Sequence, residues 1–362
     1  MSTEIIQDAG PIRLTQFSRG AGCGCKIAPS VLEEILRTEQ NGKTFPDLLV
    51  GNQSNDDAAV YDLGNGSAVI STTDFFMPIV DDAFDFGRIA SANAISDVYA
   101  MGGKPLMAVA VLGWPIEKIP VSLAQQVLEG ARKTCAEANI PLAGGHSIDA
   151  AEPIFGLAVT GLVDVSLLKK NNTATEGDLI YLTKPIGVGI LSTAIKRGLI
   201  QPEHEAVAIE SMCQLNKAGE PLGRIAGVTA MTDVTGFGIL GHLVEMASGA
   251  GLGAEIFYQD IPVAPGAREY LAQRVVPDAT FRNWNSYSSK VGFEKGVPVM
   301  EAFSLLPDPQ TNGGLLFTVK PGQEEAVEAC LQAEGLGAFA KPIGRMVAAS
   351  DKIISVRNGS FS

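Results

Sequence analysis

Short apolar runs alternate with longer segments of helical periodicity along most of this chain, and this alternation constrains the fold more than any other feature. In the first half we expect strands at 48–50, 58–62, 68–72, 106–112 and 154–163, and helices at 84–101 and 121–139. In the second half we expect strands at 178–183, 228–231, 254–258 and 314–319, and helices near 189–197, 204–217, 239–248 and 323–333. Strands and helices that alternate in this way predict α/β or α+β layers in each half.

A polar, turn-rich segment at 166–177 interrupts this pattern and marks the expected boundary between two domains. The chain has 362 residues, which suits two domains of about 150 residues each. We therefore expect α/β (α+β) domains at 48–165 and 178–350. The preceding residues are irregular and rich in glycine, with one short helix near 29–37, and they predict a mobile N-terminal arm, 1–47.

The composition excludes several classes of protein. Hydrophobic residues make up 46% and charged residues 19% of the chain, which excludes intrinsic disorder. The net charge of −13 argues against nucleic acid as a partner, although a bound Mg²⁺ would still allow a nucleotide. We see no secretory signal and no apolar stretch long enough to span a membrane. Five cysteines, an odd number, do not suggest a disulfide framework, so we expect a cytoplasmic protein.

A glycine-rich segment of the arm, 19–26, carries two thiols beside a lysine. Lys26 follows Cys23 by three residues and would favour the thiolate, which is the reactive form of the side chain. The plain alternative is a terminal segment that merely contains Cys23 and Cys25. A structural zinc site is disfavoured, because the other cysteines stand singly and histidine is scarce. We expect a mobile, reactive thiol loop.

Aspartates stand at the ends of apolar runs in four separate segments, at Asp56–Asp57, Asp74, Asp97 and Asp233. Asp97 lies one helical turn after Asn93, so these two side chains share one face of the expected helix. Any single one of these acids can be a helix cap or a turn former. Together they predict a site for Mg²⁺, which binds a few carboxylates and completes its shell with phosphate and water.

Two glycine motifs remain. Gly144–Ser147 predicts a loop whose glycines let a ligand approach the main chain, while a plain turn is the alternative. Gly236–Gly241 matches G-x-G-x-x-G, and Glu255 stands where a dinucleotide-binding protein places its ribose-binding acid. Asp233 stands three residues before the first glycine and would repel a pyrophosphate, so the dinucleotide interpretation is disfavoured. The chain has no P-loop motif.

These motifs bring the chain close to a known family. Over nearly its whole length it resembles the selenophosphate synthetase (selenide, water dikinase) family, through motifs that stand in family order: Gly20–Lys26, Asn55–Val60, Thr72–Phe76, Asn93–Asp97, Ala100–Pro105, Gly144–Ser147, Thr232–Gly238 and Asp308–Thr311.

The resemblance implies a fold, an assembly and a reaction. The expected fold is the two-domain aminoimidazole-ribonucleotide-synthetase-like fold, with the glycine-rich arm in front of it. The family usually forms homodimers through the sheets of the N-terminal domain, which for this chain means residues 50–165. The implied reaction converts ATP, selenide and water to selenophosphate, AMP and phosphate. Selenophosphate then supplies selenium for selenocysteine and for selenium-modified tRNA.

The resemblance also assigns roles to residues. Cys23 takes the position of the family's reactive cysteine or selenocysteine, and Lys26 that of its essential lysine. The positions that match the Mg²⁺ ligands are Asp57, Asp97 and Asp233. The positions that match ATP contacts are Lys26, Ser54, Asn55, Asp56, Asp74, Asp97, Gly145, His146 and Ser147. Asn312 departs from the serine expected there, and the segment 276–290 drifts from the family pattern, which leaves its role open.

Other functions stay open at this point. One is a nucleotide-binding regulator without turnover, which the presence of both Cys23 and Lys26 disfavours. Another is a neighbouring ATP-using enzyme of the same superfamily, against which the thiol loop argues. ATP and selenide are the expected small-molecule substrates and Mg²⁺ the expected cofactor. Selenide reaches the site either free or from a delivery protein.

Overall fold

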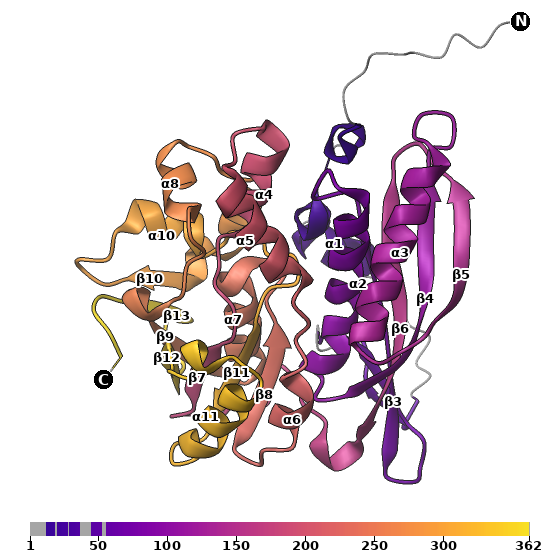
Figure 1. Ribbon diagram of the computed structural model, residues 1–362. Coiled ribbons are helices and arrows are strands. Elements are labelled where there is room, and N and C mark those ends of the chain that lie inside the picture. Colours follow the sequence, from indigo (N-terminus) through magenta and orange to yellow (C-terminus); the bar gives the residue numbers. More distant parts are fainter. Residues whose placement is uncertain (1–11, 19, 28, 37–44, 53–55, 362) are drawn as a thin grey trace, which may run out of the picture.

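The computed structural model describes residues 12–18, 20–27, 29–36, 45–52 and 56–361 (Figure 1). Among the described residues, no helix is both long enough and apolar enough to cross a membrane. The described residues form two sheets, one before and one after the segment 166–177.

The first sheet has the strand order β1-β2-β3-β6-β4-β5 and is antiparallel except where β4 and β5 run parallel. Its strands are β1 (Leu48–Val50), β2 (Ala59–Asp62), β3 (Ser67–Phe76), β4 (Lys104–Trp114), β5 (Leu142–Asp149) and β6 (Ile154–Asp164). Helices α2 (Ala83–Ala100) and α3 (Val121–Glu137) pack on one side of it (Figure 1). Along β3, buried and exposed side chains alternate, because successive residues of a strand point to opposite faces.

The second sheet has the strand order β10-β13-β9-β12-β7-β11-β8. Its strands are β7 (Leu179–Leu182), β8 (Val228–Asp233), β9 (Leu252–Phe257), β10 (Val291–Phe293), β11 (Leu315–Val319), β12 (Gly344–Ala348) and β13 (Ile354–Arg357). The helices of this half are α4 (Val188–Arg197), α5 (Pro202–Cys213), α6 (Gly219–Gly223), α7 (Gly238–Gly249), α8 (Ala267–Ala272), α9 (Asp278–Tyr287), α10 (Val299–Leu305) and α11 (Glu324–Ala333). Every residue of β11 is buried, which suits its run of apolar side chains inside the sheet.

Helix α2 lies between the two halves and belongs to the core of both. Fifteen of its eighteen residues are buried. It packs on α3, β3 and β6 of the first half and on α5 and β8 of the second. A helix that is buried on all sides needs small residues where neighbours approach closely, and α2 is rich in alanine.

The described parts of the N-terminal arm pack against both halves. They form the short helices η1 (Leu14–Phe17), η2 (Gly22–Cys25) and α1 (Pro29–Leu36). Arg13 forms an ion pair of 2.7 Å with Asp81 and donates to the carbonyl of Ile195 at 3.0 Å, which ties η1 to both halves. The mobility expected for this arm stays a prediction.

Most expected elements lie within a few residues of their predicted bounds, but one expectation was wrong. The segment Gly144–Ser147, expected as a loop, is part of the exposed edge strand β5. It was missed because an edge strand without a buried face needs no alternation of apolar residues. The short strands β10, β12 and β13 were also not predicted.

Reciprocal glycines let α2 and α3 approach closely. A Cβ on Gly87 would lie 1.9 Å from the carbonyl oxygen of Val127, and a Cβ on Gly130 would lie 2.0 Å from that of Phe84. Gly→Ala in a helix usually stabilises the protein. Here we expect Gly87→Ala to lower the free energy of unfolding by about 1–3 kcal/mol, because the backbones must separate. Urea unfolding measures this change.

The matched control is Gln125→Ala on the exposed side of α3, which should change that free energy by less than about 0.5 kcal/mol. A Gly87→Ala protein as stable as the parent would contradict the close helix contact.

Candidate active site

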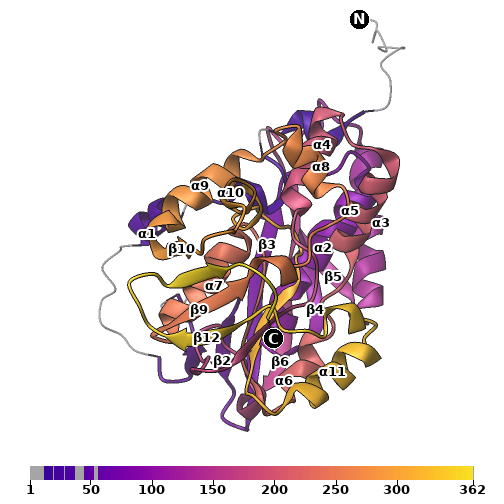
Figure 2. The ribbon, with the colours of Figure 1, turned by 90° about the vertical axis from the view of Figure 1, so that its left-hand side faces the viewer.

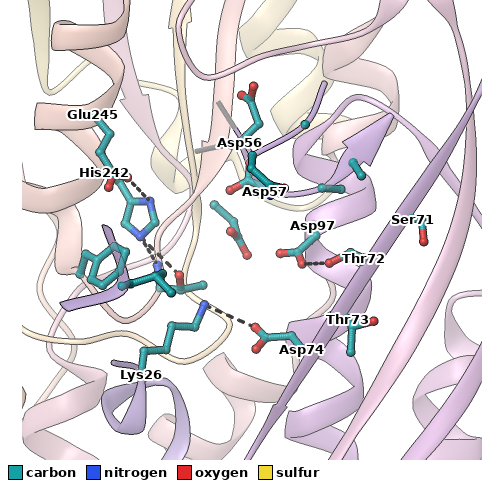
Figure 3. A pocket seen from close by; sticks show the side chains of 18 residues that line it. Lys26, Asp56, Asp57, Ser71, Thr72, Thr73, Asp74, Asp97, His242 and Glu245 are labelled. Atoms are coloured by element: carbon teal, nitrogen blue, oxygen red, sulfur yellow. Dashed lines mark hydrogen bonds and ion pairs between the residues drawn. The ribbon is translucent and has the colours of Figure 1, made fainter. Parts of the chain in front are cut away.

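A cavity of about 490 Å³ lies where the arm and the two halves meet. Its ionisable lining residues come from segments far apart in the sequence: Lys26, Asp56, Asp57, Asp74, Asp97, Asp233, His242 and Glu245. All of them except Asp233 are labelled in Figure 3. Of the residues singled out in the sequence, the structure therefore brings together Lys26 and all five aspartates. Ser54 and Asn55 lie outside the described residues.

Three of the five acids are oriented by a neighbouring hydroxyl group. Asp57 precedes β2 and accepts a hydrogen bond of 2.8 Å from Thr232. Asp97, on α2, accepts one from Thr72 of β3. Asp233 is the last residue of β8, and its carboxylate accepts a hydrogen bond of 2.5 Å from Ser96. The contacts of Asp57 and Asp233 cross between the two halves, so the positions of these two acids depend on how the halves pack.

The acids raise one another's pKa. Burial raises the pKa of Asp57 well above its usual value, and the charges of Asp233 and Asp97 raise it further. Burial is also the main cause that raises the pKa of Asp97, and the charges of Asp233 and Asp74 raise it further. Burial is the main cause that raises the pKa of Asp233, to about 6. Several carboxylates in one buried cluster therefore favour any cation that enters the pocket.

The donor set fits a hard divalent cation. Among the described residues, the second carboxylate oxygens of Asp56 and Asp57 are buried and have no hydrogen-bond partner. Carboxylate oxygens are the protein ligands that Mg²⁺ takes, usually with phosphate and water in the rest of the shell. Within the described part of the chain, no three His, Cys, Asp or Glu side chains are already grouped as a metal site. The pocket therefore contains carboxylates that can bind a metal ion, but the described residues do not form a complete set of protein ligands around one point.

A chain of hydrogen bonds connects the arm to this pocket. The thiol of Cys23, which is 1% exposed, donates to Oδ1 of Asn93 at 3.2 Å. The Asn93 amide nitrogen donates in turn to Asp74. Lys26 Nζ lies 3.7 Å from the same Asp74 carboxylate (Figure 3). Asn93 thus holds the thiol loop and Asp74 in one network.

Lys26 is the cation of the site. The charge of Asp74 is the main cause that raises its pKa beyond the ordinary lysine value, and burial opposes this effect. The lysine is therefore protonated at neutral pH. Its side chain is 38% exposed and lines the cavity, so its charge faces the space that the aspartates surround.

The G-x-G-x-x-G segment serves the packing of the arm. A Cβ on Gly236 would lie 2.6 Å from the carbonyl oxygen of Cys23, and one on Gly241 would meet Phe237 and Tyr287. Glu255, the expected ribose-binding acid of a dinucleotide site, pairs with Arg345 at 2.9 Å and with Arg357. The structure thus gives these residues roles unrelated to a dinucleotide.

Gly145, His146 and Ser147 do not line this pocket. They lie on the exposed edge strand β5. Gly145 is needed there because a Cβ would lie 2.3 Å from the carbonyl oxygen of Ala110 on β4. Within one chain, the structure therefore does not bring these three residues together with the aspartates.

Sequence reasoning missed two ionisable residues of the pocket wall, His242 and Glu245, which both lie on α7. His242 on α7 is 7% exposed, and burial lowers its pKa to about 3. Its Nε2 accepts from the main-chain N–H of Thr235 at 3.0 Å. The ring is therefore neutral at pH 7 and fixes the turn after Asp233. The available signal in the sequence was the place of His242 in the expected helix 239–248. A lone histidine on a helix is weak evidence for a functional residue.

Asn312, the departure from the family pattern, has a structural role. Its φ of +48° is a conformation that asparagine tolerates better than most residues. Its side-chain amide donates to the carbonyls of Met212 at 2.6 Å and Gln214 at 2.8 Å. Its main-chain N–H donates to Asn93 at 2.7 Å. Asn312 therefore supports the network that holds Cys23.

Comparison with known proteins shows the family of this chain. Two family descriptions match, "AIR synthase related protein, N-terminal domain" over residues 55–163 and its C-terminal counterpart over 175–357. A selenide, water dikinase of Cronobacter sakazakii is 58% identical over 326 residues, which are 90% of this chain and 92% of that protein. A selenide, water dikinase of Escherichia coli is 57% identical over 338 residues, which are 93% of this chain and 96% of that protein.

Solved structures show the fold. A chain of the HypE–HypF complex has a TM-score of 0.66 at 16% identity and covers 91% of this chain and 96% of its own length. Thiamine-monophosphate kinase from Stenotrophomonas maltophilia has a TM-score of 0.62 at 19% identity, with coverage of 86% and 91%. The two-domain fold expected from the sequence is confirmed. Because its relatives are so similar over nearly their whole length, the chain belongs to the selenide, water dikinase family, within the AIR synthase related proteins.

Proposed function

We propose that this chain makes selenophosphate from ATP, selenide and water, and releases AMP and phosphate. The observation that carries the proposal is the meeting of five aspartates and Lys26 in one cavity, next to the buried thiol of Cys23. The relatives that are 55–58% identical carry the name of this reaction. Their similarity disfavours both a regulator without turnover and a neighbouring ATP-using enzyme.

Mg²⁺ is the cofactor that the site fits. Asp57, Asp97 and Asp233 would hold it, and the partnerless oxygen of Asp57 supports this assignment. The bound ion would neutralise the charge of the triphosphate. Of the positions that match ATP contacts, Lys26, Asp56, Asp74 and Asp97 line this cavity.

Lys26 and Cys23 have separate tasks in the proposal. Lys26 places a permanent positive charge beside the space for the phosphates, where it would offset negative charge during phosphoryl transfer. Cys23 would hold selenide through a hydrogen bond from its thiol and steer it, with no change of oxidation state, which avoids free diffusion of one anion toward another. Because the thiol is buried and its loop covers it, the loop must move for this step.

The experiment that tests the function is selenide-dependent AMP formation by the purified chain. We expect Cys23→Ser to lower this rate at least about a hundredfold and Lys26→Ala by a similar factor, because each removes a group that acts on the reacting atoms. Lys26→Arg should restore little activity, since the planar guanidinium differs in shape from the ammonium group. Cys25→Ser should have a milder effect.

Binding of Mg²⁺–ATP by Cys23→Ser is the control, since only the later step should fail in this variant. Full activity in Cys23→Ser would exclude the role of that thiol and would favour direct attack of selenide on ATP.

The acids give a second prediction with two opposite effects. Asp233→Asn keeps the size of the side chain but removes one charge of the cluster. We expect AMP formation to fall at least about a hundredfold at ordinary Mg²⁺ concentration. In EDTA, the melting temperature should stay equal or rise, because less repulsion remains among buried carboxylates. Asp351→Asn on the surface should change neither quantity.

A lower melting temperature in EDTA together with normal AMP formation would contradict the metal-ligand role of Asp233.

Assembly is the third part of the proposal. The outer face of the first sheet exposes large apolar side chains, namely Phe75, Leu106, Met107, Val109 and Ile148. Exposed apolar patches of this kind mark contact surfaces. We propose a homodimer through this face, within residues 50–165. Such a dimer would also place His146 and Ser147 near the interface. A cytoplasmic location and a selenium-delivery protein stay predictions.

Sedimentation at micromolar concentration checks the dimer. We expect the parent chain to sediment as a dimer and Met107→Glu as a monomer, because a buried unpaired carboxylate opposes association. Met300→Glu is the matched control: Met300 is 81% exposed on α10, in the second half of the chain. A dimeric Met107→Glu protein, or a monomeric parent, would contradict the proposed interface.

A further inference from the structure

A second cavity, of about 620 Å³, lies against the thiol loop. Gly20, Ala21 and Gly24 of the loop form part of its wall, and Lys26 lines this cavity as well as the first one. The rest of the lining comes mainly from α4 and from the segment around the start of α9. The loop that carries Cys23 is therefore a wall shared by two cavities.

The second cavity is basic, in a chain whose net charge is −13. Lys26, Lys196, Arg197 and Arg282 line it, and among the described lining residues Asp278 is the single carboxylate. Such a lining raises the local concentration of small anions. The first cavity has the opposite character, since it gathers five aspartates.

Two of these cations hold the loop itself. Lys196 Nζ donates to the carbonyls of Ser18 at 2.9 Å and Gly20 at 3.1 Å. Arg282 donates to the carbonyl of Gly24 at 2.7 Å. Among the described residues, Arg197 contributes charge and one long hydrogen bond, of 3.5 Å, to the carbonyl of Val276. Arg197 is exposed, so its charge can be changed with little effect on the loop.

Electrostatics separates the routes of the two substrates. The triphosphate would occupy the acidic cavity, where its charge and that of the aspartates repel a second anion. Selenide at neutral pH is the hydrogen selenide anion and must still reach the thiol of Cys23. We propose that the basic cavity binds this anion and is its route to Cys23. This inference rests on the proposed function.

The first test does not depend on turnover. Iodoacetate is an anionic thiol reagent and iodoacetamide a neutral one, and both need the same opening of the loop to reach Cys23. With Mg²⁺–ATP present, the ratio of their labelling rates at Cys23 is measured by peptide mass spectrometry. We expect Arg197→Glu to lower this ratio roughly three- to tenfold, and Arg197→Gln to lower it less.

The control is Lys341→Glu, which changes the charge by the same amount. Lys341 is exposed and lies a few residues after the end of α11 in the sequence. Helix α11 is at the opposite end of the molecule from α4 in both views (Figures 1 and 2). The ratio in this variant should equal that of the parent chain. A ratio that Arg197→Glu leaves unchanged would overturn the proposal, whether or not the chain makes selenophosphate.

Steady-state kinetics is the second test. Arg197→Glu should raise the KM for selenide roughly three- to tenfold and leave kcat and the KM for ATP unchanged. The alternative is that the product phosphate leaves through this cavity. Arg197→Glu would then change product inhibition by phosphate and leave the KM for selenide unchanged, and this result would overturn the proposal. A parent chain without selenide-dependent AMP formation would contradict the proposed function, while the labelling ratio would still report on the cavity.

Discussion

The burial of α2 between the two halves is the constraint on which the rest of this structure depends. A polar side chain on a helix buried on all sides must find a hydrogen-bond partner, because an unpaired polar group in the core is costly. Asn93 meets Cys23 of the arm, Ser96 meets Asp233 of the second sheet, and Asp97 meets the first sheet. Each partner lies in a different part of the chain. The same helix therefore packs the two halves together and positions the groups of the active site.

The active site conflicts with the stability of the metal-free protein. Burial and mutual repulsion raise the pKa of Asp57, Asp97 and Asp233, and hydrogen bonds and Lys26 offset only part of this cost. Proteins commonly keep such unfavourable clusters where function needs them. The two cavities have linings of opposite charge. The acidic one suits a cation with its phosphates, the basic one suits a small anion, and the thiol loop lies between them.

Much of the fold could be predicted from local patterns. The periodicity of 84–101 and 121–139 is strong, and both segments are helices close to those bounds. Strand β5 was missed because an exposed edge strand with two glycines carries no periodic signal. Strands β12 and β13 are short and place Arg345 and Arg357 on Glu255, a pairing that becomes visible only when the strands lie side by side.

The sequence by itself determined the chemistry that this protein can perform. Acids at the ends of apolar runs, a thiol and a lysine in a glycine-rich segment, and motifs in family order were all legible without coordinates. The tertiary structure decided which of these groups meet. It brings Asp57, Asp97 and Asp233 into one cavity but leaves His146 on an exposed edge, and it turns the segment 276–290 into part of a basic cavity. The physical reason is that charge repulsion, burial and hydrogen bonding act through distances in space, which local periodicity does not encode.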